Sequence, residues 1–296
     1  MFRLNPLNDF IFQKLFGEKG DEEQLLSLLN AILYPTLGSK LVSLEISEHT
    51  RLVADIIGNK TGILDIMAFT DDNTWINVEV QLRDSGNMER RSLFYCSCSY
   101  SRFLQAGQDY SELPKVISIN IVDFECNPLE DFHTIFHIWE DSNRYKLTDA
   151  LEIHFIDLTK FVKLAKKDLK NDPLHRWLTY FCQNIPDHTL QEVIKMDSTI
   201  KKTDEKMKFI SQDNQTLRMY LLHDMALSDQ TSFINQAKRK GLAEGIEEGR
   251  KEGIQEGKMK IAEKLLISGM TIKEVASLTE LGLPVVSDIH SKLDID

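Results

Sequence analysis

The clearest alternation of hydrophobic and polar positions lies between Thr61 and Leu82, in the stretch TGILDIMAFTDDNTWINVEVQL. Successive side chains of a strand point to opposite faces, so this pattern predicts two strands joined by a polar turn. The first strand is apolar on both faces apart from Asp65, as is typical of a central strand covered on both sides. In the second strand the hydrophobic residues share one face and the polar residues share the other, namely Asn77, Glu79 and Gln81.

The turn between these strands sets their register. If residues 71–73 form a three-residue loop, positions pair about residue 72 and Asp65 lies directly opposite Glu79. Opposed carboxylates destabilise a hairpin unless something neutralises them, and a divalent cation would do so. Mg²⁺ suits such a site because it prefers oxygen ligands and typically takes one or two carboxylates. A plainer alternative is the solvated face of an edge hairpin, with Asp65 in a salt bridge.

Two helices are predicted before the hairpin. The first is capped by Asn8 or Asp9 and ended by Gly17, and the second is capped by Asp21 with Gln24 in a capping box. Apolar runs predict further strands, at residues 41–46, 52–57, 116–124, 134–139 and 151–158. A helix capped by Asp84 or Ser85 follows the hairpin, and the pattern turns helical again from residue 161.

Five glycines recur every four residues in KGLAEGIEEGRKEGIQEGK, at Gly241, Gly245, Gly249, Gly253 and Gly257. Each costs about 1 kcal/mol against Ala inside a helix, so a helical segment needs an interaction that offsets the cost. Residues four apart drift by about 40° around a helix, so the glycines form a slanting bare groove into which another helix packs. We expect two copies to associate here as a homodimer, with a flexible charged linker as the alternative.

The last part of the chain is similar to a helix-turn-helix. Thr271 and Glu274 form a capping-box signature, and Pro284 begins a final helix. A helix that reads DNA needs cations for the phosphates, yet this one offers only Lys292 and His290. We therefore expect dimer packing from this region rather than sequence reading.

An ordered series of motifs runs along most of the chain: LNDFIFQKLFG, KTGILDIMAF, INVEVQ, NMERRSLFY and YSELPKVISINIVDF. This series resembles the PD-(D/E)XK nuclease superfamily and, within it, the Rpn family of recombination-promoting, transposase-like nucleases. In that family the motifs match the opening segment, the two catalytic strands, and the helix and strand that follow them. The repeated Glu-Gly steps and the final helices are similar as well.

The resemblance implies an α/β fold with a restriction-endonuclease-like mixed central sheet flanked by helices, followed by an all-helical C-terminal region. A length of 296 residues accommodates one substantial domain and a smaller appendage. The expected division is a PD-(D/E)XK nuclease-like domain at 1–190, a helical connector at 191–236, and a glycine-striped, helix-turn-helix-like oligomerisation region at 237–296.

Roles for the hairpin residues follow from the same resemblance. It implies that Asp65 and Glu79 are metal ligands and that the backbone carbonyl of Val80 is a third ligand. Gln81 occupies the place of the superfamily's usual lysine, a cation that orients the attacking water and stabilises charge at the phosphorus. Glu-x-Gln is nevertheless the normal pattern for this particular family.

A further carboxylate comes from an N-terminal helix in some members of the superfamily. Glu22 and Glu23 lie at the start of the second predicted helix, so Glu23 is a candidate for that extra acid. The alternative is that both are first-turn acids favoured by the helix dipole.

The net charge of −11 argues against a protein that coats nucleic acid, because Lys and Arg supply most of the non-specific affinity for phosphates. A nuclease needs only a local basic rim. We expect Arg83, Arg90 and Arg91 to form this DNA-binding rim beyond the catalytic strand, with Lys60 at its other end. The resemblance favours phosphate contacts for Arg90 and Arg91, and solvated charges near a helix start are the alternative.

Composition and motifs argue against several other classes of protein. No apolar run approaches the roughly 18 residues that cross a membrane, and the N-terminus lacks a signal-peptide pattern, so we expect a cytoplasmic protein with no membrane partner. Nucleotide-binding motifs are absent from the sequence, which argues against a nucleotide cofactor. The four cysteines have neither a disulfide nor a zinc spacing and are expected to be reduced. His133, His137 and His154 fall on predicted strands, where they are expected to be edge or core residues.

The sequence therefore predicts a metal-dependent DNA endonuclease that hydrolyses phosphodiester bonds with Mg²⁺ or Mn²⁺. The alternative is a catalytically inactive nuclease fold that acts as a DNA- or protein-interaction module. Asp65 and Glu79 favour the enzyme, whereas Gln81 and the acidic net charge favour the alternative.

Overall fold

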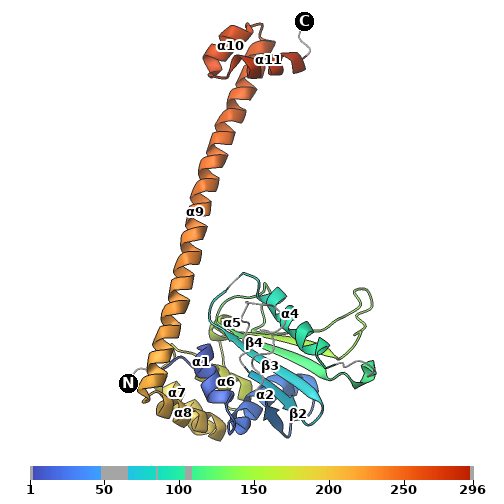
Figure 1. The fold of residues 1–296 in the computed structure, drawn as a ribbon, viewed down its shortest axis with the longest axis vertical. Coiled ribbons are helices and arrows are strands. Elements are labelled where there is room, and N and C mark those ends of the chain that lie inside the picture. Colours follow the sequence, from blue (N-terminus) through green and yellow to red (C-terminus); the bar gives the residue numbers. More distant parts are fainter. Residues whose placement is uncertain (1–2, 48–65, 85, 104–108, 294–296) are drawn as a thin grey trace. The chain divides into compact units, whose positions relative to one another are not determined.

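A mixed sheet lies at the centre of the described residues, which in this computed structural model are 3–47, 66–84, 86–103 and 109–293 (Figure 1). Six strands of these residues follow the order β1-β2-β3-β4-β6-β5. Their bounds are Leu44–Ile46 (β1), Ile66–Thr70 (β2), Thr74–Gln81 (β3), Lys115–Val122 (β4), His133–Phe136 (β5) and Leu151–Asp157 (β6). β3, β4 and β6 are parallel, and the other pairs are antiparallel. The predicted strand at 52–57 lies outside the described residues.

The register of the β2–β3 hairpin agrees with the one expected from the turn. Ile66 pairs with Val78 and Phe69 pairs with Trp75, so the strands are matched about residue 72. Residues 71–73 form the loop between them. Asp65 precedes β2 and lies outside the described residues, so its place opposite Glu79 stays a prediction.

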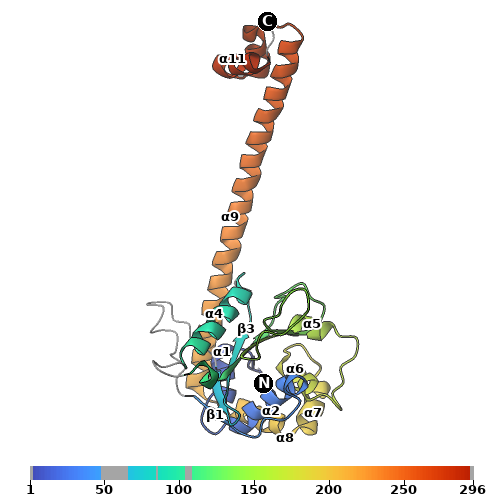
Figure 2. The same cartoon turned by 90° about the vertical axis from the view of Figure 1, so that its right-hand side faces the viewer.

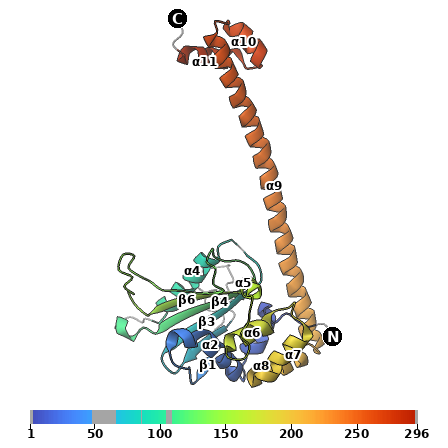
Figure 3. The same ribbon diagram turned by 180° about the vertical axis from the view of Figure 1, so that it is seen from behind.

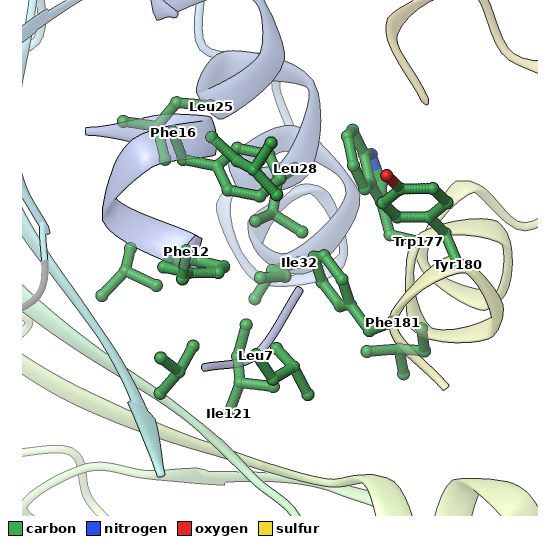
Figure 4. Close-up of a cluster of buried hydrophobic side chains, with 14 of the residues drawn as sticks. Leu7, Phe12, Phe16, Leu25, Leu28, Ile32, Ile121, Trp177, Tyr180 and Phe181 are labelled. Atoms are coloured by element: carbon green, nitrogen blue, oxygen red, sulfur yellow. The ribbon is translucent and has the colours of Figure 1, made fainter. Parts of the chain in front are cut away.

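One face of the sheet is covered by α1 (Asp9–Phe16), α2 (Glu22–Leu37) and α6 (Pro173–Phe181) (Figure 1). Ile76, Val78 and Val80 of β3 and the Ile residues of β4 pack into the same core. Figure 4 shows its aromatic centre, where Phe12 and Phe16 lie near Trp177 and Phe181. The polar residues of β3 therefore face the opposite side.

That opposite face is covered by α4 (Met88–Ser101), which packs on β4 and β6 (Figure 2). Met88 contributes to a smaller cluster with Val122 and Phe155. A 3-10 helix, η1 (Tyr110–Glu112), precedes β4, and α5 (Leu158–Lys163) follows β6 directly. The side chain of Asp157 caps α5 by accepting a hydrogen bond from the Lys160 N–H.

The N-terminal helix caps were only partly as predicted. Asn8 caps α1 through its side chain, which accepts from the Ile11 N–H, and Gly17 ends that helix, as expected. The predicted capping box of α2 is wrong, because the Asp21 side chain makes no capping hydrogen bond. Its carboxylate instead accepts hydrogen bonds from Lys206 Nζ at 2.7 and 2.8 Å, which ties the start of α2 to a later helix.

Two further helices, α7 (Asp187–Met196) and α8 (Ser198–Ile210), pack beside α6 and α2 (Figure 3). Val193, Ile200 and Met207 belong to the same core as α1 and α2. The first compact unit of the chain accordingly spans Met1–Met225, and the second spans Ala226–Asp296. The functional division expected at residues 190 and 236 stays a prediction.

The C-terminal region is helical, as predicted, with α9 (Asn214–Ile267), α10 (Ile272–Thr279) and α11 (Leu283–Lys292). α9 runs without a break through all five glycines, so the flexible-linker alternative is wrong. The capping box of Thr271 and Glu274 is confirmed. Ala262 and Leu266 of α9 pack with Val275, Val286 and Ile289 in a small core. Among the described helices, none combines the length and the apolar character needed to cross a membrane.

Candidate active site

Glu79 lies near the end of β3, on the sheet face beneath α4. Its neighbours Val78 and Val80 point into the other core, and alternation along the strand turns the carboxylate away from them. The residue is only 1% exposed. Burial raises the pKa of the Glu79 carboxyl, and the nearby charge of Arg91 opposes this shift without cancelling it. The strand thus holds a carboxylate where ionisation is costly.

Arg91, on α4, forms an ion pair with Glu79 Oε1. Its guanidinium also lies 5.4 Å from the centre of the Tyr95 ring, one helical turn further on. Glu79 Oε2 and Arg91 Nε have no hydrogen-bond partner among the described residues, so Arg91 reaches the carboxylate through one nitrogen and one oxygen. The contact is therefore an incomplete ion pair rather than the closed, two-bond arrangement that Arg and carboxylates often adopt.

A polar patch continues from Glu79 across the sheet under α4. Asn120 lies opposite Glu79 in the parallel register and is fully buried. Its side chain accepts a hydrogen bond from Ser92 Oγ at 2.8 Å and donates to the His154 carbonyl at 3.0 Å. Asn77 of β3 lies opposite Ser118 of β4 in the same register, and both residues are buried. Their side chains lack hydrogen-bond partners among the described residues. These groups leave the patch under-satisfied and polar.

Sequence reasoning missed most of this patch. Asn77 was placed on the face of Glu79, but Ser118 and Asn120 were read only as part of an apolar strand. A signal was present, because VISINIVDF places Ser118 and Asn120 two residues apart and therefore on one face. Ser92 could not be assigned as a partner, since nothing in its own stretch indicates which strand it meets.

Gln81 and Val80 end β3 beside Glu79. Gln81 is half-buried, on the same strand face as Glu79, and its carbonyl accepts the Asp123 N–H at 3.0 Å. The Val80 side chain is buried in the opposite core. The expected role of the Val80 carbonyl as a metal ligand stays a prediction.

The DNA-binding rim expected from the sequence stays a prediction, and its residues occupy different positions. Arg90 is exposed on α4 next to Arg91, and Arg83 is half-buried in the segment after β3. Arg91 itself contacts Glu79. Lys60 lies outside the described residues, as does Asp65.

Glu23 does not lie beside Glu79. It lies on α2, whose buried residues cover the sheet face opposite to α4. Its carboxylate forms an exposed ion pair with Lys202 Nζ of α8 at 2.5 Å. The proposed role as an extra acid therefore has no geometric support from the described residues.

The donors around Glu79 suit a hard divalent cation. The described residues include no group of three or more His, Cys, Asp or Glu side chains able to hold a metal, and Asp65 is not among them. Glu79 nevertheless offers a buried carboxylate whose Oε2 has no hydrogen-bond partner among the described residues. Oxygen donors of this kind are the ligands that Mg²⁺ and Mn²⁺ prefer.

Comparison with known proteins decides the family. A family model described as PD-(D/E)XK nuclease family transposase matches residues 6–237. The chain belongs to this family. No curated protein and no solved structure gives a significant match.

The fold agrees with this assignment to the PD-(D/E)XK nuclease family transposases. A mixed sheet flanked by helices is the architecture of PD-(D/E)XK nucleases, and the resemblance seen in the motifs is confirmed. Membership supports a nuclease-type function with DNA as the class of substrate. PD-(D/E)XK nucleases generally use divalent metal ions.

A second buried polar cluster lies on the other sheet face, at the edge formed by β5 and β6. The Glu152 carboxylate accepts from Lys115 Nζ and from His154 Nε2, both at 2.6 Å. His133 Nε2 lies 2.9 Å from His154 Nδ1, and His137 Nε2 lies 3.5 Å from Glu152. Burial and the neighbouring His154 lower the pKa of His133 to about 4. These histidines occupy edge and core positions, as expected from the sequence.

Proposed function

We propose that this chain is a Mg²⁺- or Mn²⁺-dependent DNA endonuclease of the recombination-promoting type, acting in the cytoplasm. The observation that carries the proposal is Glu79, a buried carboxylate of raised pKa that pairs with Arg91 through Oε1, while its Oε2 has no hydrogen-bond partner among the described residues. Such a group is costly in a purely structural role. The cost is explained if the position serves to bind a cation. All four cysteines are free, in keeping with a reducing compartment.

In this proposal Asp65, Glu79 and the Val80 carbonyl hold the metal. When bound, the divalent ion supplies charge stabilisation at the scissile phosphate and lowers the pKa of a bound water. Gln81 follows Glu79 by two residues on β3 and therefore lies on the same strand face. In this proposal its amide would orient the attacking water. Arg83, Arg90 and Arg91, with Lys60, bind the phosphates that flank the cleaved bond.

A second candidate is a catalytically inactive nuclease fold that serves as an interaction module. Gln81 in the place of the superfamily's lysine and the net charge of −11 favour it. A module of this kind gains nothing from a buried carboxylate whose Oε2 has no hydrogen-bond partner among the described residues. The enzyme is therefore the better account of Glu79.

We also propose a homodimer formed through the glycine-striped part of α9. Leu242, Ile246, Ile254 and Ile261 are all more than half exposed there. The five glycines face open space, with no other atom within 4 Å of an added Cβ. Glycines inside a helix cost about 1 kcal/mol each against Ala, and close packing of a second helix on the bare groove would offset that cost.

Nicking of supercoiled plasmid tests the enzyme against the module. The parent protein should nick plasmid with Mg²⁺ or Mn²⁺ and lose this activity with a chelator, whereas Asp65→Ala should be inactive in both conditions. Glu89→Gln, an exposed change on α4, is the matched control and should keep parental activity. Purified parent protein that binds plasmid but never nicks it, with either metal, would favour the interaction module.

A further inference from the structure

We propose that Arg91 exchanges partners during the reaction cycle. In the metal-free protein its guanidinium neutralises Glu79, and when a divalent cation binds Glu79 the guanidinium moves to a DNA phosphate. Metal binding and DNA binding are thereby coupled through one side chain. This inference rests on the proposed nuclease function and concerns the regulation of the same site.

The first support is the incompleteness of the Arg91–Glu79 pair. A buried ion pair is stabilising only when its geometry is good and its remaining donors and acceptors are satisfied. Glu79 Oε2 and Arg91 Nε have no hydrogen-bond partner among the described residues. The pair therefore lacks the second bond that would make it a stable structural link.

The second support is the unequal burial of the two side chains. The Glu79 side chain is 2% exposed and is fixed on a central strand, whereas the Arg91 side chain is 31% exposed. Arg91 therefore already reaches from the buried carboxylate toward solvent, where the exposed Arg90 also lies. A short rotation of its flexible stem brings the guanidinium to a phosphate without any change in the sheet.

The third support is that α4 does not depend on Arg91 for its position. The next residue, Ser92, hydrogen-bonds to Asn120 in the sheet. Met88 at the start of the helix is buried against Val122 and Phe155. Arg91 can leave Glu79 while these contacts hold the helix in place.

Electrostatics then makes the exchange directional. A divalent cation and a guanidinium that share one carboxylate repel each other strongly in a partly dry site. The cation therefore displaces Arg91, and the released guanidinium gains a charge-assisted contact from any phosphate bound nearby. Coupling of this kind is reciprocal, so DNA that captures Arg91 raises the affinity for metal by the same factor.

Metal affinity without DNA provides the first test. Calorimetric titration of Mn²⁺ at pH 8 should give a Kd at least about tenfold lower for Arg91→Gln than for the parent, because the competing cation is gone. Arg102→Gln, at the exposed C-terminal end of α4, is the matched control and should keep the parental Kd, and Arg91→Lys should remain near it. Equal affinity in the parent and in Arg91→Gln overturns the exchange. Absence of Mn²⁺ binding in the parent and in every variant overturns the proposed metal site itself.

DNA affinity provides a second readout that does not require cleavage. With hydrolysis-resistant phosphorothioate DNA, Mn²⁺ should tighten binding by the parent and steepen its salt dependence by about one phosphate contact. Arg91→Gln should show neither change, while melting curves confirm that it is folded. A Mn²⁺ effect of parental size in Arg91→Gln would show that Arg91 does not carry the coupling.

Discussion

Glu79 on β3 lies opposite Asn120 on β4, and two consecutive residues of α4 contact this pair. Arg91 forms the ion pair with Glu79, and Ser92 donates a hydrogen bond to Asn120. The candidate site is therefore assembled from two adjacent strands and one helical turn. The Ser92–Asn120 hydrogen bond is fully buried. The Arg91–Glu79 ion pair is partly exposed on the arginine side and leaves Glu79 Oε2 without a partner among the described residues.

Removal of the Ser92 hydroxyl should destabilise the first compact unit. Ser92→Ala leaves Asn120 Oδ1 without its donor in a fully buried position, which costs about 1–3 kcal/mol of unfolding free energy. Urea denaturation measures this loss. Ser97→Ala, the same change at an exposed position of α4, corrects for helix propensity and should be neutral or slightly stabilising. Equal behaviour of the two variants would show that the bond does not anchor the helix.

Neutralising Glu79 should not destabilise the metal-free protein. The raised pKa of this carboxyl means that the folded state disfavours its ionised form, so the parent loses stability as pH rises above the usual range of Glu. Glu79→Gln removes that penalty and should melt at the same temperature as the parent or higher at neutral pH.

Melting curves with chelator at pH 7.5 test this directly. Glu89→Gln on the exposed face of α4 is the control for a change of net charge. A clear loss of stability in Glu79→Gln would show that the Arg91 pair holds the fold together, and would argue for a structural role of Glu79.

The hairpin illustrates what the sequence determines. Alternation placed Asn77, Glu79 and Gln81 on one face, and a three-residue turn set the register, because both are local properties of the chain. The residue pairs between β2 and β3 confirm that register.

The Arg91–Glu79 contact shows what the sequence leaves open. The family resemblance favoured a phosphate contact for Arg91, and its own stretch shows only a charge near a helix start. Which strand face lies beneath α4 depends on tertiary packing, and no local pattern encodes it. The same holds for Asp21, whose partner Lys206 lies 185 positions away in sequence.

The histidine cluster should make stability depend on pH. The pKa of His133 falls from the usual 6.5 to about 4, so the unfolded chain binds more protons between these values. The contribution of His133 to the unfolding free energy should therefore decrease by about 2–3 kcal/mol as pH falls from 7.5 to 4.5. Urea denaturation across this range measures the slope.

His133→Gln isolates the contribution of that residue, and its slope should be flatter than that of the parent. His188→Gln, the same change at an exposed position, is the matched control and should keep the parental profile. A parental slope in His133→Gln would place the protonation elsewhere in the fold.

Added bulk along the glycines of α9 should dissociate the proposed dimer. Gly249→Leu and Gly253→Leu separate the two helices, because only a bare backbone permits close approach. Light scattering should then give the mass of the monomer. Lys251→Leu adds the same side chain at an exposed position about 160° around the helix from both Gly249 and Gly253, and should leave the dimer intact. Parental mass in both glycine variants would show that the groove is not an interface.

The central claim is that the carboxylates of Asp65 and Glu79 bind a divalent cation, and stabilisation by Mg²⁺ tests it most directly. At a hundredfold excess over Kd, Mg²⁺ should raise the unfolding free energy of the parent by about 2.7 kcal/mol. Asp65→Asn and Glu79→Gln should gain nothing under the same conditions. An equal gain in the parent and both variants, or no gain in the parent, would contradict the claim.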